Sequence, residues 1–203
     1  MSETSLLQPT PLFKKTAWWF ERAKASLLDT LPCCQGCSHC CVGLFSVTLL
    51  DKQEIQRGLQ LLPMEHRKRV EAKAQEQVSQ LRIAAPRLCT NQFVDRWPDE
   101  EMDTLVERFD ALPCPALDPD GRCSVYENRP LVCRSMGLPM DSDGVVSGAC
   151  IVQTSVPLIR LSNALREEEN LLAWKEAGEL AAVCHHNGGQ GGEVLLPYAF
   201  LPD

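Results

Sequence analysis

The sequence predicts a small, mainly α-helical single domain whose centre is irregular and rich in loops. Three observations lead to this prediction. Apolar residues recur at helical spacing in several segments, most clearly over residues 99–112. The stretch 114–150 shows no such period and is punctuated by Pro, Gly and Asp. Hydrophobic residues make up 44% of the 203 residues, which is enough for one ordinary core and does not call for a second domain.

The first helix is expected within residues 1–32. Thr10 can serve as its N-cap, and Pro11 suits the first helical position because a proline there lacks only an N–H that would have no helical partner. Apolar residues then recur at helical spacing up to the proline that closes the segment. Because Trp18 and Trp19 are adjacent, at least one of them is expected to point away from this apolar stripe.

Three more helices are expected in an insertion at residues 51–112, after a short strand or extended link at 42–50. The first of these helices begins with a capping box, Asp51-Lys-Gln-Glu54, and ends near Pro63. The second starts at that proline, and its predicted buried face consists of Val70, Ala74, Val78 and Leu81. The third opens at Pro98, carries acidic residues in its first turn, and closes at the proline before residue 114.

The C-terminal segment, residues 152–203, is expected to be helical again and then to end in a tail. The helical pattern runs from about Leu158 to Cys184, with a break near Asn170. A glycine-rich loop and an apolar stretch follow it. Residues 1–32, the cysteine-containing module 33–151 with its insertion, and this segment are together expected to form one domain, residues 1–203.

The charge and the N-terminus narrow the classes of function. A formal net charge of -7 gives the chain no general attraction for a phosphate backbone, so no nucleic-acid partner is expected. The N-terminal stretch has no apolar run long enough for a secretory signal, and no segment is long and apolar enough to span a membrane. We therefore expect a cytoplasmic protein with no membrane partner, in which thiols stay reduced.

Residues 33–41, CCQGCSHCC, hold five of the eleven cysteines of the chain. Within them lies the pattern Cys34-x-x-Cys37-x-x-Cys40-Cys41. Two cysteines separated by two residues place their sulfurs at the spacing of neighbouring ligands of one metal ion. In a reducing compartment this spacing favours metal binding over disulfides, and the odd cysteine count agrees, because a fully oxidised monomer would leave at least one thiol unpaired.

A second group of cysteines lies in the loop-rich stretch. Between two of them the sequence reads Tyr126-Glu127-Asn128-Arg129-Pro130. The two groups together resemble the CxxCxxCC zinc- or iron-chelating domain of the YkgJ-like cysteine-cluster proteins, over residues 33–151. The resemblance implies metal chelation, and the matching cysteines are Cys34, Cys37, Cys40, Cys41, Cys114, Cys123, Cys133 and Cys150. Cys33, Cys89 and Cys184 fall outside the pattern.

Eight thiolates can hold either two four-coordinate ions or one 4Fe-4S cluster with four thiols to spare. The first three cysteines of the first group have the spacing of a bacterial ferredoxin, but that spacing breaks because Cys41 directly follows Cys40. Neighbouring side chains diverge from the backbone, so these two are expected to serve different metals or different corners of a cluster. Zinc and iron both stay open as the metal.

The negative charge of metal thiolates calls for nearby cations, and Arg122, Arg129 and Arg134 are the candidates. The alternative interpretation is that these arginines lie on the exposed surface or donate hydrogen bonds to loop carbonyls. His39 and the run Cys184-His185-His186 are alternative ligands, with solvent-exposed helix ends as the simpler interpretation. Gly188-Gly189-Gln190 is interpreted as a flexible loop.

Three functions agree with these features. The first is a metal-binding protein whose cysteine-ligated zinc or iron core is flanked by amphipathic helices; a full set of thiol ligands leaves no open position for metal-ion catalysis. The second is an iron-sulfur or thiol-dependent redox enzyme, based on the ferredoxin-like first block and on thiols left to spare. Separately, a cysteine beside His66 or His185 could act as a nucleophile, although the spacing selects no one pair. The third is an interaction module, in which the metal stabilises a surface that the first and last helices offer to a protein partner.

Overall fold

The computed structural model describes residues 10–25, 37–136, 140–142, 145–147 and 160–202. Within these ranges the chain is mainly α-helical, as predicted, with seven α-helices: α1 (Pro11–Lys24), α2 (Leu49–Leu61), α3 (Met64–Ala84), α4 (Asp99–Arg108), α5 (Leu131–Ser135), α6 (Asn163–His186) and α7 (Leu196–Ala199). The strands are β1 (Ser46–Thr48), β2 (Met140–Ser142), β3 (Val145–Ser147) and β4 (Glu193–Leu195). Three short 3-10 helices are η3 (His39–Cys41), η4 (Pro86–Cys89) and η5 (Tyr126–Asn128).

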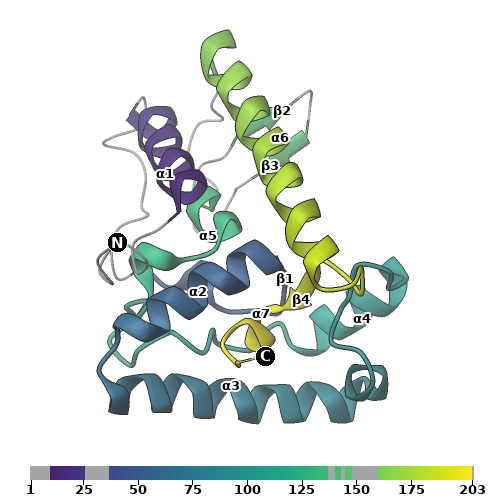
Figure 1. Cartoon of the computed structure of the whole chain (residues 1–203). Helices are drawn as coiled ribbons and strands as arrows, with labels where there is room; N and C mark the ends of the chain where they lie inside the picture. The colour runs from purple at the N-terminus through teal and green to yellow at the C-terminus, as the bar shows by residue number, and fades with distance from the viewer. Residues whose placement is uncertain (1–9, 26–36, 137–139, 143–144, 148–159, 203) are drawn as a thin grey trace.

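The main core lies between α2 and α3, with the C-terminal α7 packed against both of them (Figure 1). Ile55 and Leu59 of α2, together with the predicted face of α3, are almost completely buried. Phe200, just after α7, is 1% exposed. Because a fully buried side chain of this size contributes about 1.5–3 kcal/mol through the hydrophobic effect, the apolar tail is a main stabilising part of the domain.

A short sheet joins two segments that lie far apart in the sequence. Strand β1 pairs antiparallel with β4, with Val47 opposite Val194. A second pair, β2 with β3, forms a separate antiparallel two-stranded sheet. No helix among the described residues is both long enough and apolar enough to cross a bilayer.

Helices α1 and α6 pack against each other above this core (Figure 1). Trp19 of α1 is buried, and its indole N–H donates a 2.9 Å hydrogen bond to the carbonyl of Leu165. Its neighbour Trp18 is 67% exposed, which confirms that only one of the two faces the apolar stripe. Pro11 occupies the first helical position as predicted, and the expected continuation of this helix beyond residue 25 falls outside the described residues.

The capping box of α2 lies three residues before the predicted one. Thr48 is the N-cap: its hydroxyl accepts a hydrogen bond from the backbone N–H of Asp51 at 3.2 Å, and the Asp51 carboxylate accepts one from the Thr48 N–H at 3.1 Å. The prediction that Asp51 is the cap and Glu54 its partner is therefore wrong. Since the helix starts earlier, Glu54 lies in the second turn and faces the protein interior.

Two helix boundaries also differ from the prediction. Helix α6 is one continuous helix of 24 residues, so the predicted break near Asn170 is wrong. Asn170 is exposed in its middle, where an asparagine costs only about 0.7 kcal/mol relative to alanine. Helix α4 stops at Arg108, five residues before the proline that was expected to end it, because Phe109 leaves the helical conformation.

The glycine-rich segment after α6 forms a tight structural turn. Gly188 and Gly189 have φ values of +71° and +69°, which L side chains rarely adopt, and they end the helix. At Gly191 an added Cβ would lie 2.5 Å from Phe93, so the backbone itself packs on that ring. The Gly192 N–H then donates to the Asp95 carboxylate at 2.6 Å. This turn leads the chain into β4.

Candidate metal centre

Three segments that are far apart in the sequence meet beside α2. They are the turn around η3, the hairpin at residues 114–124 and the short helix α5. The first two segments are joined by backbone hydrogen bonds, from Cys114 N–H to the Cys41 carbonyl at 2.7 Å and from Gly43 N–H to the Leu112 carbonyl at 2.8 Å. Cys41 and Cys114 are therefore neighbours in space although 73 positions separate them in the sequence.

The hairpin carries Cys114 and Cys123. Its two sides are joined by the Ser124 N–H, which donates to the Ala116 carbonyl, and its tip is a turn in which the Gly121 N–H donates to the Asp118 carbonyl. Gly121 has a φ of +81° at this tip. On the outer side of the hairpin, the imidazole Nε2 of His66 lies 3.0 Å from both Asp118 and Ser124, so α3 fixes the hairpin in place.

Five thiols lie close enough to influence one another electrostatically: Cys40, Cys41, Cys114, Cys123 and Cys133. Burial raises the pKa of the Cys133 thiol well above its ordinary value, and negative charge on Cys114 and Cys123 would raise it further. The pKa of Cys114 is raised to about 12, again mainly by burial and next by Cys123. Without a cation these thiols are therefore held in the neutral form.

The adjacent pair Cys40 and Cys41 behaves differently. A hydrogen bond between their two thiols lowers the pKa of Cys40 to about 6, although burial opposes this shift. The same hydrogen bond, together with burial and the charges of Cys114 and Cys123, raises the pKa of Cys41. The pKa of Cys41 is thus influenced by the hairpin cysteines, and that of Cys40 by the positive charges of Arg129 and His39.

Backbone N–H groups point at two of the sulfurs. The N–H groups of Ala116 and Leu117 donate to the Cys114 thiol, and the N–H of Val125 donates to Cys123. These hydrogen bonds favour the thiolate form, so they lower the pKa against the effect of burial. Donors that stabilise an anionic sulfur in a buried hairpin fit a role of both cysteines as metal ligands.

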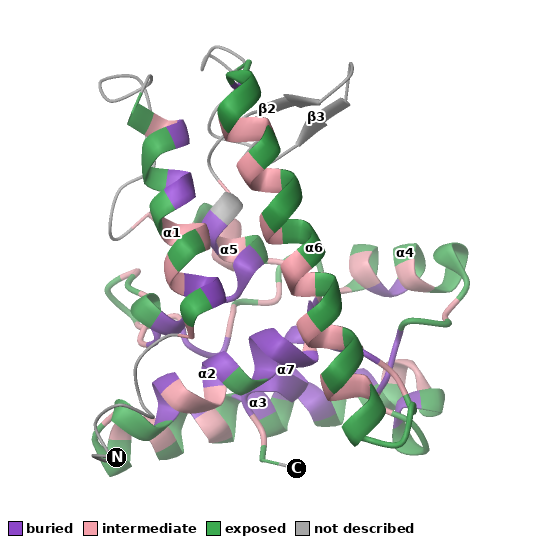
Figure 2. Ribbon diagram, turned by 45° about the horizontal axis from the view of Figure 1, so that its top comes forward, coloured by how far each residue is buried: buried purple, intermediate pink, exposed green. Residues whose placement is uncertain are grey.

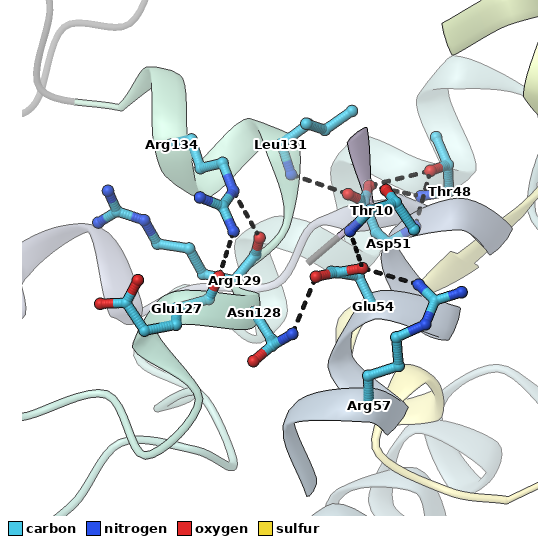
Figure 3. A network of polar contacts seen from close by, with 10 residues as sticks. All are labelled: Thr10, Thr48, Asp51, Glu54, Arg57, Glu127, Asn128, Arg129, Leu131 and Arg134. Atoms are coloured by element: carbon cyan, nitrogen blue, oxygen red, sulfur yellow. Dashed lines mark hydrogen bonds and ion pairs between the residues drawn. The ribbon is translucent and has the colours of Figure 1, made fainter. Parts of the chain in front are cut away.

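Arg129 supplies a positive charge next to this cluster. Its charge lowers the pKa of both Cys40 and Cys123, and its guanidinium lies 4.1 Å from the centre of the Tyr126 ring. Its Nε is buried without a hydrogen-bond partner. In Figure 3 the guanidinium of Arg129 points away from the carboxylates of α2. A buried donor without a partner beside several thiols fits an anionic metal–thiolate group.

The other two arginines lie in different surroundings. Arg122 is exposed and forms a 3.5 Å ion pair with Asp120 at the hairpin tip. Arg134 is buried and donates to the carbonyls of Glu127 and Arg129, so it closes the loop that leads to Cys133. Of the three predicted charge-neutralising residues, only Arg129 has a charge that lowers the pKa of cluster thiols, namely Cys40 and Cys123.

Two carboxylates of α2 hold the loop between the hairpin and α5 (Figure 3). Glu54 accepts a 2.8 Å hydrogen bond from the side-chain amide of Asn128, and Asp51 accepts one of 2.8 Å from the backbone N–H of Leu131. Arg57 neutralises Glu54 from the exposed side, at 2.8 Å. Both contacts fix the backbone that positions Cys133, so α2 acts as the support of the cluster.

Sequence reasoning did not assign Asp51, Glu54 and Asn128 to the site. The sequence does contain a signal for the two carboxylates. Asp51 and Glu54 share one helical face with Ile55 and Leu59, and on such an apolar face a charged residue is unusual unless it is paired. Asn128 was interpreted only as part of a motif, because its partner lies 74 positions away in the sequence.

The remaining predicted residues divide into three groups. Cys37 is half-buried at the start of its described segment, whereas Cys34 and Cys150, like Cys33, fall outside the described residues. Cys89 is exposed near the Arg82 carbonyl, and Cys184 lies near Gly192 at the end of α6, so neither belongs to the cluster. His39 is exposed beside Cys40 and, by its charge, lowers that thiol's pKa, while His185 and His186 are exposed at the helix end.

The described thiols alone do not make a complete ligand set. In the part of the chain that the structure describes, no three His, Cys, Asp or Glu side chains form a group that could hold a metal ion. Two of the eight predicted ligands fall outside that part. The chemistry of the donors fits zinc or iron, because buried thiols, N–H donors to sulfur and an adjacent guanidinium all favour metal-bound thiolates.

One comparison with known proteins gives a match. The model of the family described as "CxxCxxCC: Putative zinc- or iron-chelating domain" matches residues 33–150, which is more than half of the chain. Comparison with curated proteins and with solved structures gives no significant match. The matched region begins and ends at cysteines and includes the η3 turn, the hairpin, η5 and α5, together with the helices α2, α3 and α4 between them.

Proposed function

The chain belongs to the CxxCxxCC family of zinc- or iron-chelating domains, and we propose that its thiol cluster binds zinc or iron as a structural or stored metal. The observation that carries this proposal is the meeting of five thiols from three distant segments, two of which, Cys40 and Cys123, are influenced by the positive charge of Arg129. Burial and mutual repulsion oppose the ionisation of four of these thiols, those other than Cys40, whereas a divalent metal would stabilise all five as thiolates.

The ligands that we propose are the eight cysteines of the two sequence groups: Cys34, Cys37, Cys40, Cys41, Cys114, Cys123, Cys133 and Cys150. Such a set supplies either two four-thiolate sites or a 4Fe-4S cluster with additional thiols. Bound metal would join the η3 turn to the hairpin and to α5. Arg129 would offset part of the negative charge of the thiolates through its buried Nε–H.

The test is elemental analysis of protein purified without air, together with an absorbance spectrum. Zinc or iron at one or more per chain, lost largely in Cys114→Ser and in Cys133→Ser, is the expected result. The matched control is Cys89→Ser, which changes an exposed thiol outside the cluster and should keep the full metal content. Absorbance near 400 nm would identify iron-sulfur, and a colourless protein with zinc would identify zinc.

Two results would overturn the proposal. One is wild-type protein that carries neither metal in stoichiometric amount even after anaerobic reconstitution with Zn²⁺ and Fe²⁺. The other is a folded Cys114→Ser variant, verified by circular dichroism, that keeps as much metal as Cys89→Ser does.

A further inference from the structure

Helix α6 exposes one continuous face along most of its length. Six exposed residues follow one another at spacings of four, three, four, three and four positions, and we call them the α6 seam: Glu167, Leu171, Trp174, Gly178, Ala181 and His185. Trp174 is 79% exposed and Leu171 is 69% exposed. In Figure 2 the whole helix shows exposed and intermediate residues and no buried ones.

This spacing is the repeat of a coiled coil. Residues that alternate at three and four positions stay on one side of a helix, and apolar residues in these positions form the contact with a second helix. The four central positions of the seam are Leu, Trp, Gly and Ala. The side of α6 that packs on α1 uses other residues, among them Leu165 and Leu172, so the seam is not needed for that contact.

The apolar surface continues from the seam onto α1. Trp18 of α1, 67% exposed, and Leu171 line the same groove between the two helices, with Arg22 and Lys175 at its edge. Exposed tryptophans are rare on the free surface of a monomer and common at the centre of interfaces. Trp18 and Leu171 thus share this groove, and Trp174 follows Leu171 on the exposed face of α6.

We propose that the α6 seam packs antiparallel against the α6 seam of a second copy of this chain. In this register Trp174 lies opposite Gly178 of the second copy, and Leu171 lies opposite its Ala181. The outermost layer places Glu167 opposite His185 of the second copy. Because a twofold axis relates the two helices, each of these three contacts occurs twice.

Shape and charge favour a second copy of this chain as the partner, and an antiparallel arrangement of the two helices. Each large side chain meets a small one, and at Gly178 no atom lies within 4 Å of the place where a Cβ would be, so the surface there is open to receive an indole. An acidic residue meets a basic one at both ends. A parallel alignment would instead place Trp174 on Trp174 and Glu167 on Glu167, which crowds the centre and repels at the end.

Sedimentation of the full chain as purified, at about 100 µM, tests the interface, since this concentration populates a dimer with a Kd in the micromolar range. Wild-type protein is expected to sediment as a dimer. Ala181→Glu places a charge in the seam and should weaken dimerisation at least about tenfold, a change of about 1.4 kcal/mol. The matched control is Ala173→Glu, another exposed alanine of α6 outside the seam, which should dimerise like wild type.

A charge exchange tests the register. Glu167→Lys should weaken the dimer because a lysine then faces His185 of the second copy. Adding His185→Glu to the same chain should restore dimerisation. Eighteen positions separate the two residues, about 27 Å along one helix, so a rescue cannot arise within one α6.

Three results would overturn the proposal: a wild-type monomer at the concentration used, equal behaviour of Ala181→Glu and Ala173→Glu, or no rescue in the double variant. A dimer that persists in Ala181→Glu would place the interface elsewhere, and a wild-type monomer that binds another protein through Trp174 would assign the seam to a different partner. None of these variants changes a cysteine, so the result is independent of the metal proposal.

Discussion

The side-chain amide of Asn128 lies 2.8 Å from the carboxylate of Glu54, and both residues are buried. This hydrogen bond joins the loop before Cys133 to α2, across 74 positions of sequence. The Tyr126–Pro130 motif lies between two of the proposed ligands, Cys123 and Cys133. The hydrogen bond of Asn128 shows that this motif also attaches the loop before Cys133 to the main core.

Asn128→Ala should lower the free energy of unfolding by about 2 kcal/mol, because the Glu54 carboxylate would lose a buried donor. Urea unfolding of the metal-loaded protein measures this change. Asn170→Ala is the matched control: that asparagine is exposed within α6, where alanine is the better helix former, so the variant should be unchanged or slightly more stable. Equal stability of the two variants would contradict the role given to the Glu54 contact.

Thr48→Ala should cost about 1 kcal/mol, since it removes the N-cap hydroxyl of α2. Thr104→Ala is the comparison, because the Thr104 hydroxyl only donates to a carbonyl within exposed α4, and little change is expected. Comparing the melting temperatures of both variants distinguishes an N-cap at Thr48 from one at Asp51. If α2 were capped at residue 51 instead, Thr48→Ala would have no more effect than Thr104→Ala.

Removal of the metal should destabilise the domain. A ligand that binds only the folded state at about 1,000 times its Kd stabilises it by about 4 kcal/mol, and a chelator removes that contribution. The melting temperature should therefore fall on addition of EDTA in wild type and in Cys89→Ser alike. A folded Cys114→Ser variant should melt lower from the start and respond little to the chelator; a wild-type melting temperature unaffected by chelation would contradict a structural role of the metal.

Among the three arginines, we expect only Arg129 to control metal affinity. Arg129→Gln removes the charge beside Cys40 and Cys123 and should weaken metal binding about 10- to 100-fold. Competition with a chromophoric chelator measures this affinity. Arg122→Gln loses only an exposed pair with Asp120 and should bind like wild type. Arg129→Lys keeps the charge and should recover part of the loss; identical affinities of all three variants would exclude Arg129 from the site.

Local patterns predicted most of the helices correctly, because periodicity and prolines act within a few residues. The buried face of α3 and the start of α1 at Pro11 are confirmed in this way. The errors arose where local signals compete. The Asp51 to Glu54 spacing satisfies a capping box as well as the Thr48 to Asp51 spacing does, and only the burial of Glu54 against Asn128 decides between them.

The cluster could be predicted in its members but not in its arrangement. The resemblance to the cysteine-cluster family implied Cys114, Cys123 and Cys133 as partners of the first cysteine group. It could not rank the three arginines, since that depends on which side chain faces Cys40 across the fold. The burial of the tail was missed for the same reason: the pairing of Val194 with Val47 joins residues that are 147 positions apart in the sequence.

The pairing of β1 with β4 also sets an order of events during synthesis. Residues 193–200 complete the core under α2, yet they are translated after the whole region that the family model matches. At about 5–20 residues per second the ribosome needs several seconds to pass from Cys150 to Phe200. During that interval the thiols have been made but their support is incomplete. The thiols of a nascent chain therefore stay open to oxidation until the last strand completes the core.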